Sequence, residues 1–151
     1  EKSSDPCTGR HPGSGNLGTM FRSGEGAGVT GILMDTQTAD MFNPKTIRST
    51  MAAFIGFRFD RTGSEREYPT DAGGWNIRIC AHLEGSVCYD EPDYTTPSAF
   101  LIGNEGNGLT DETAALANQY IRIPMEGRLE SLNAAVAASL LLYETNRQRR
   151  H

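Results

Sequence analysis

The sequence has few cysteines, few histidines and no long apolar run, and each shortage argues against a class of protein. Its three cysteines, Cys7, Cys80 and Cys88, are odd in number and lack CxxC or CxxH spacing, which argues against a disulfide framework and a zinc site. The histidines are scattered, so we expect no metal site. No run is as long as a membrane span, and the polar first residues do not read as a signal peptide. We therefore expect a cytoplasmic protein that does not act at a membrane.

Positively charged residues are also outnumbered by negatively charged ones. The 14 Lys and Arg residues against 19 Asp and Glu give a formal net charge of −5, which argues against non-specific coating of nucleic acid. A local basic surface stays open as a prediction. Its candidate members are Arg147, Arg149 and Arg150 at the C-terminus, with Lys45, Arg48, Arg122 and Arg128. From charge alone, a solvated charged tail is at least as good an account.

The length and the 37% hydrophobic content fit one globular domain with a buried core. We expect residues 1–15, rich in Gly, Pro and Ser, to be irregular, and residues 16–151 to fold. Six short apolar runs are predicted strands: GVTGILM, FIGFRF, NIRICA, SVCY, AFLIG and YIRIP. Helices are predicted between them, so the chain is α/β, with a mainly parallel sheet flanked by helices.

Capping residues mark the ends of the predicted helices. The first helix runs from Leu17 to about Ala27 and stops at Gly28. Asn43 caps the second, with proline at its first position, and Thr110 caps the third. The longest helix follows ESLN, and we expect its apolar first half to be buried and its polar last turns to be exposed.

Three loops carry unusual residues at positions where α/β sheets bind ligands, beyond the C-terminal ends of strands. They are GNLGTMFR, GNEGNGLT and PMEGRLESLN. Taken singly, each has a structural account: Glu105 solvated on a glycine turn, Ser131 capping the last helix, Asn133 bonded locally, and Arg22 on a helix surface. The glycine turn is not a nucleotide P-loop, because no Gly-Lys-Ser/Thr follows it.

Taken together, the motifs NLGTMFRS, NPKTIRSTMAA, LIGNEGNGL and IPMEGRLESLNAAVAASLLLYE are much more specific. In this order they resemble the SpoU (TrmH-type) family of SPOUT RNA 2′-O-ribose methyltransferases, from about Asn16 to Arg150. The resemblance implies an α/β fold whose C-terminal segment forms a deep trefoil knot, a rare exception to unthreaded connections. It also implies a homodimer, S-adenosylmethionine as cofactor, and a ribose 2′-hydroxyl of tRNA or rRNA as substrate.

The resemblance assigns cofactor-binding roles to the knot loops. Gly103 would let the backbone approach the cofactor, while Ile123 and Leu132 would hold it from the other two loops. Met125 and Leu132 suit the faces of the adenine. The remaining cofactor-binding residues are the polar pair at the start of the last helix, Ser131 and Asn133.

The catalytic assignments follow from the same motifs. Asn16 and Arg22 match the family's first motif, Glu105 would orient a donor such as Arg22, and Ser131 and Asn133 lie near the same centre. The family's arginine is usually assigned as the general base. Because a guanidinium stays protonated in nearly all environments, we prefer a role in stabilising the alkoxide and gripping a phosphate.

One departure from the family pattern keeps a second hypothesis open. Asp5 and Pro6 are followed by CTGRHPGSG, and no apolar strand precedes Asn16 as the family pattern expects. A displaced Arg22 would favour a knotted RNA-binding or cofactor-binding module without catalysis. A generic nucleotide-binding α/β protein is the third reading, and it leaves ESLNAAVA unexplained.

Overall fold

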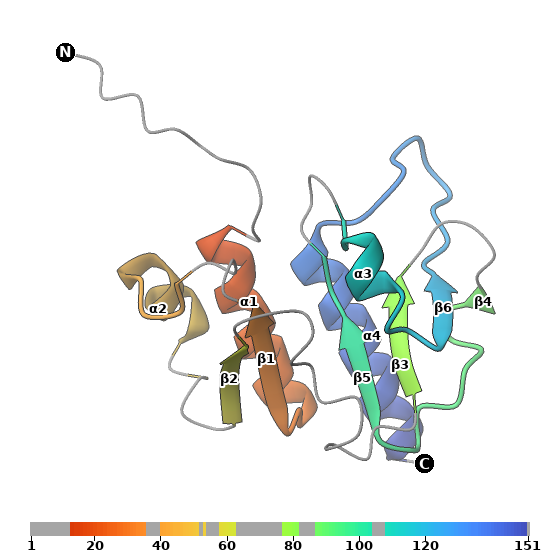
Figure 1. Cartoon of the computed structure of the whole chain (residues 1–151), viewed down its shortest axis with the longest axis horizontal. Coiled ribbons are helices and arrows are strands. Elements are labelled where there is room, and N and C mark those ends of the chain that lie inside the picture. Colours follow the sequence, from red (N-terminus) through yellow and green to blue (C-terminus); the bar gives the residue numbers. More distant parts are fainter. Residues whose placement is uncertain are drawn as a thin grey trace.

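The computed structural model describes residues 13–35, 40–51, 53, 58–62, 77–81, 87–103 and 108–150. These residues form both helices and strands, with strands in succession between the second and third helices, and each strand pairing among them is parallel. The predicted α/β class is therefore confirmed. In Figure 1, helices α1 (Ser14–Ala27) and α4 (Ala134–Arg149) lie side by side behind the strands, and the short α3 (Asp111–Ala114) lies in front of them.

The first part of the chain forms two helices and a pair of parallel strands. These elements are α1 (Ser14–Ala27), β1 (Gly31–Asp35), α2 (Pro44–Thr50) and β2 (Arg58–Thr62). The predicted irregular segment 1–15 extends too far, because α1 begins at Ser14, with Gly13 as its N-cap. Residues 1–12 lie outside the described residues. The predicted stop is confirmed: Gly28 has φ 78°, a left-handed conformation that glycine adopts at little cost.

Helix α2 begins as its sequence predicts. The side-chain oxygen of Asn43 accepts a hydrogen bond from the Lys45 amide at 2.9 Å, and Pro44 takes the first helical position. The helix packs on α1 where Gly18 has no side chain. A Cβ at Gly18 would overlap the Ser49 hydroxyl, so this glycine permits the close approach of the two helices.

The second part of the chain forms a four-stranded parallel sheet in the order β4-β6-β3-β5. Its elements are β3 (Ile77–Ala81), β4 (Val87–Cys88), β5 (Ser98–Leu101), α3 (Asp111–Ala114), β6 (Gln119–Arg122) and α4 (Ala134–Arg149). In the register, Cys80 of β3 lies opposite Leu101 of β5 and Tyr120 of β6. The C-terminal ends of these strands therefore share one edge of the sheet.

Two apolar clusters form the core. The first consists of Leu17, Phe21, Met34 and Met41, and the second of Ile79, Tyr94, Ile121 and Leu141. Helix α4 contributes to the second with one face. The prediction of a buried first half and exposed last turns is confirmed in outline, because Ala135, Ala138 and Leu141 are buried and Arg147, Arg149 and Arg150 are exposed. Burial also follows one face of the helix, since Val136 in the first turn is 51% exposed and Thr145 near the end only 8%.

Among the described residues, no helix is long and apolar enough to cross a membrane. The same residues contain no group of three or more His, Cys, Asp or Glu side chains that would hold a metal ion.

Candidate functional site

The parallel strands place two predicted site residues at one edge of the sheet. Gly103 follows β5 and Ile123 follows β6, and these two strands flank β3 on either side. Figure 1 shows that the segment leaving β6 crosses this edge before it enters α4. The sheet topology thus gathers the loops that the sequence singled out.

Asn133 joins the last of these loops to α1. Its side-chain oxygen accepts hydrogen bonds from the amides of Ala135 at 3.0 Å and Val136 at 3.2 Å, which makes it the N-cap of α4. Its side-chain nitrogen donates to the side-chain oxygen of Asn16 at 3.1 Å. Asn133, rather than Ser131, therefore caps this helix, and the first and last motifs meet in one contact.

The contact between Asn133 and Asn16 is the first of a series along two parallel helices. The hydroxyls of Ser23 and Ser139 are 2.6 Å apart, and the side-chain nitrogen of Asn146 donates to the Ala27 carbonyl at 3.1 Å. The sequence analysis did not predict these polar contacts between α1 and α4. The spacing of Asn16 and Ser23 could have indicated them, since residues seven apart lie on one face of a helix.

Arg22 is not brought to the Asn16–Asn133 contact. It lies six residues after Asn16, and at 3.6 residues per turn this turns it about 240° around α1. Its side chain is exposed, and none of the described residues forms a hydrogen bond or an ion pair with it. Glu105, its predicted partner, lies outside the described residues.

The two described ends of the glycine-rich loop lie close together. A Cβ at Gly103 would overlap the carbonyl carbon and oxygen of Gly108 and lie 2.5 Å from the nitrogen of Leu109. Gly108 has φ 67°, a left-handed conformation that glycine adopts at little cost. The close approach at Gly103 that the structure describes is therefore made to the loop's own backbone.

Three apolar side chains of the loop segments are predicted to contact the cofactor. Ile123, Met125 and Leu132 are each half-buried, and Ile123 packs against the second core cluster. Ile123 is thus anchored, and part of the apolar surface of all three side chains stays available. Half-buried apolar side chains beside loop backbone suit a flat heterocycle, whose faces are apolar and whose edge forms hydrogen bonds. The residues present fit an adenosine-type cofactor, with Ser131 exposed nearby.

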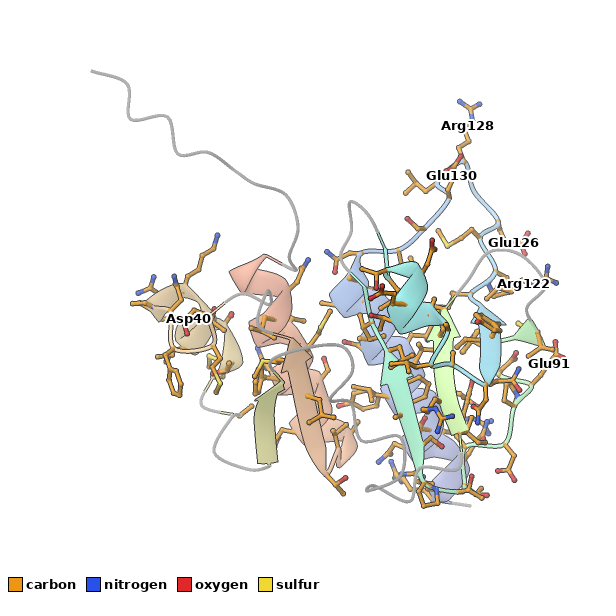
Figure 2. The ribbon with its side chains drawn as sticks, in the orientation of Figure 1. Asp40, Glu91, Arg122, Glu126, Arg128 and Glu130 are labelled. Carbon is orange, nitrogen blue, oxygen red and sulfur yellow. The ribbon has the colours of Figure 1, made fainter. Side chains whose placement is uncertain are left out.

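Charged residues lie along the segment between β6 and α4. Figure 2 shows Arg128 at its far end, projecting away from the body of the molecule, with Glu130 and Glu126 nearer to it. Arg122 ends β6 on the same side. These side chains are exposed. Arg128 and Arg122 remain candidates for contact with a polyanion.

Two arginines of the tail are engaged elsewhere. Arg147 forms a salt bridge with Glu144 at 2.7 Å. Arg149 donates from its guanidinium to the carbonyls of Tyr94 and Thr96, both at 2.8 Å. Figure 1 places the C-terminus at the edge of the molecule opposite to the loop before α4. Arg147 and Arg149 therefore bind this chain's own groups, and the position of the tail does not support the RNA-facing role predicted for its three arginines.

Three kinds of comparison with known proteins identify the family that the sequence motifs resemble. Residues 11–143 match the family model described as the SpoU rRNA Methylase family. The chain is 35% identical over 141 residues to a 23S rRNA (uridine(2479)-2′-O)-methyltransferase of Streptomyces viridochromogenes, covering 89% of this chain and 49% of that protein. It is 32% identical over 137 residues to a tRNA (guanosine(18)-2′-O)-methyltransferase of Escherichia coli strain K12, covering 90% of this chain and 59% of that protein.

A solved structure agrees with these matches. An AdoMet-bound rRNA methyltransferase from Sinorhizobium meliloti superposes with a TM-score of 0.84 at 38% identity, over 91% of this chain and 53% of that one. The chain thus spans about half the length of the relatives it matches.

Proposed function

Because the chain belongs to the SpoU rRNA methylase family, we propose that it transfers a methyl group from S-adenosylmethionine to a ribose 2′-hydroxyl of tRNA or rRNA. The observation that carries the proposal is the hydrogen bond from Asn133 to Asn16, which joins the first and last motifs. The names of matching relatives, which are 2′-O-methyltransferases of 23S rRNA and of tRNA, support this substrate class. We also propose a cytoplasmic location, in keeping with the free thiols of Cys80 and Cys88.

The cofactor would be held by the three loops at the strand ends. When bound, S-adenosylmethionine supplies a methyl group activated by its positively charged sulfur. The side chains of Ile123, Met125 and Leu132 would contact the adenine faces, and the backbone at Gly103 its edge. Ser131, exposed before the cap of α4, would offer a hydroxyl to the cofactor's polar end. We further propose that the chain forms a trefoil knot here, in keeping with its membership of the family that the motifs resemble.

The catalytic groups would act mainly by position and charge. The side-chain oxygen and nitrogen of Asn133 are both engaged, by the α4 amides and by Asn16, so these two residues would fix the site's geometry rather than move protons. Arg22 would grip a phosphate and stabilise the negative charge that develops on the ribose oxygen, with Glu105 orienting the guanidinium. The hydroxyl proton would pass to solvent as this oxygen takes the methyl group and S-adenosylhomocysteine leaves. Correct placement of the two reacting groups supplies a large part of the barrier reduction.

A homodimer is the proposed assembly. Val136 and Tyr143 of α4 are 51% and 52% exposed, and their seven-residue spacing puts them on one face of the helix. A second copy would cover this apolar stripe. Because α1 turns Arg22 away from the Asn16 of its own chain, Arg22 would act in a dimer at the reacting centre of the second copy.

A second function keeps the fold and omits the chemistry. The orientation of Arg22 away from the Asn16–Asn133 contact favours a knotted module that binds RNA or cofactor without catalysis. Methyl transfer separates the two functions. Incorporation of labelled methyl groups into unmodified tRNA or 23S rRNA transcripts would exclude the non-catalytic module.

The first test is calorimetric titration with S-adenosylhomocysteine. We expect micromolar binding, and a loss of about tenfold or more for Leu132→Ala, since an apolar contact of this size contributes at least 1.5 kcal/mol. Leu129→Ala is the matched control, because this leucine of the same segment is 74% exposed. Absence of binding by the folded wild-type chain would contradict the proposal.

A further inference from the structure

Helix α2 exposes the kind of side chain that a surface helix normally buries. Its threonines Thr46 and Thr50 are buried, whereas Ile47 is partly exposed and Met51 is 71% exposed. Phe42, just before the helix, is 62% exposed. Figure 1 shows α2 on the side of α1 that faces away from α4. Within the described part of the chain, this apolar surface is left open to a ligand.

The backbone around Phe42 is held in place. Its amide donates to the Asp40 side chain at 2.9 Å, and the Thr46 hydroxyl donates to the Asp40 carbonyl at 3.0 Å. The preceding residue, Met41, is buried in the first core cluster. Because its neighbour is anchored inward and its own amide is bonded, Phe42 presents its ring outward from a fixed turn. A ring held in this way loses little freedom when it binds.

Two cations share the surface with these apolar side chains. Lys45 and Arg48 are both exposed and lie three residues apart, so they are neighbours on the helix. Arg48 is also three residues from Met51. Neither cation has an ion-pair partner among the residues that the structure describes. In a chain of net charge −5, two such cations beside an exposed aromatic ring mark a local site for a polyanion with flat apolar groups.

We propose that the α2 surface, formed by Phe42, Lys45, Ile47, Arg48 and Met51, binds an unpaired stretch of the substrate RNA. A base would stack on Phe42, and neighbouring phosphates would pair with Lys45 and Arg48. Stacking on an aromatic side chain combined with phosphate contacts is the usual chemistry of single-strand binding.

The position of the surface fits this role, which rests on the proposed function. Helix α2 is seated directly on α1, where a Cβ at Gly18 would overlap Ser49. Helix α1 in turn carries Asn16 and Arg22. RNA held on α2 would therefore run past the helix that supplies the first motif.

The test is binding of a fluorescein-labelled, mixed-sequence 20-nucleotide single-stranded RNA, followed by anisotropy at several salt concentrations. Phe42→Leu should weaken binding about fivefold to a hundredfold, and Phe42→Trp should restore it, since stacking on an aromatic ring contributes about 1–3 kcal/mol per base. The double variant Lys45→Gln/Arg48→Gln should reduce the slope of log K against log salt by about 1.4, at about 0.7 for each phosphate contact. Arg150→Gln, an exposed arginine at the opposite edge, should leave the slope unchanged.

Three results would overturn the proposal. They are wild-type affinity in both the Phe42→Leu and the double variant, absence of RNA binding by the wild type, and conversion of a dimer to monomers by Met51→Ser with RNA binding unchanged. The last would make the surface a contact between copies of the chain. Titration of the same preparations with S-adenosylhomocysteine distinguishes failure of this proposal from failure of the proposed function. Only failure of the proposed function would appear as absence of S-adenosylhomocysteine binding by the wild type.

Discussion

The side-chain nitrogen of Asn133 donates to the side-chain oxygen of Asn16 at 3.1 Å, across 117 residues of sequence. The same side chain caps α4 through its oxygen. One residue thus sets where the last helix begins and how that helix meets α1. The two roles use different atoms, so substitutions can separate them.

Substitutions at position 133 should lose the cap and the bridge in two steps. Asn133→Ser keeps a capping oxygen but does not reach Asn16, and we expect a loss of about 1 kcal/mol in the free energy of unfolding. Asn133→Ala loses both contacts, about 2 kcal/mol in total. Urea unfolding measures the difference. Asn16→Ala should have little added effect in either background, and a fully additive loss would rule out the bridge.

The two glycines near the start of α1 should respond oppositely to alanine. Gly18→Ala would overlap Ser49 and bring a Cβ within 2.9 Å of the Thr46 carbonyl, so we expect a loss of about 1–3 kcal/mol through overpacking. Gly15→Ala has no atom within 4 Å of the new Cβ and should stabilise the helix by up to about 1 kcal/mol. Thermal unfolding of the two variants gives the comparison. Equal shifts in Tm would contradict the packing of α2 on α1.

Local features of the fold followed from the sequence because their signals are local. Asn43 with Pro44, Thr110 and Gly28 each mark a helix end within one or two residues, and the structure has those ends there. Each of the six apolar runs overlaps a strand of the described residues, but β2 begins only at Arg58 and extends to Thr62, beyond the predicted run FIGFRF. The start of α1 was missed, because Gly13 caps it without a side-chain hydrogen bond.

The arrangement of the site did not follow from the sequence, because it depends on contacts between distant segments. The spacing of Asn16 and Arg22 puts them on different faces of α1, but nothing local indicates which of these faces meets α4. The glycine at position 103 was expected to make room for a cofactor, and the described close approach is to Gly108. Motif matching places residues in one region, but only the packing of α1 against α4 shows which of them touch.

The end of α4 should contribute to stability through Arg149. Its guanidinium donates to the carbonyls of Tyr94 and Thr96, on the segment that leads into β5. Arg149→Ala should lower the free energy of unfolding by about 1–2 kcal/mol, since hydrogen bonds from a charged donor are stronger than neutral ones. Arg149→Lys should recover only part of the lost stability, because its ammonium is a charged donor but lacks the planar fork of the guanidinium. Arg150→Ala is the control, and an equal loss there would point to a general charge effect.

Stability should depend on pH through Glu144. Hydrogen bonds from Arg147, together with one from Gln148, lower the pKa of this carboxyl from its ordinary value of 4.5. A lowered folded-state pKa stabilises the fold above the unfolded value, and this stabilisation is lost as the pH falls through the folded value. Glu144→Gln should therefore lower Tm by roughly 2 °C at pH 7, where the carboxylate is ionised. It should make little difference once the pH lies below the folded-state pKa. A Tm difference that persists unchanged into acid would contradict the ion pair.

Gly103→Ala should damage the loop that is proposed to hold the cofactor. The new Cβ would meet the backbone of Gly108 and Leu109, and backbone atoms cannot move aside as a flexible side chain can. We expect a loss of about 1–3 kcal/mol in the free energy of unfolding and weaker binding of S-adenosylhomocysteine. Gly127→Ala is the matched control for stability, because no atom lies within 4 Å of its added Cβ. A Gly103→Ala chain with wild-type Tm and wild-type cofactor binding would contradict both the close backbone approach at Gly103 and its proposed role in the site.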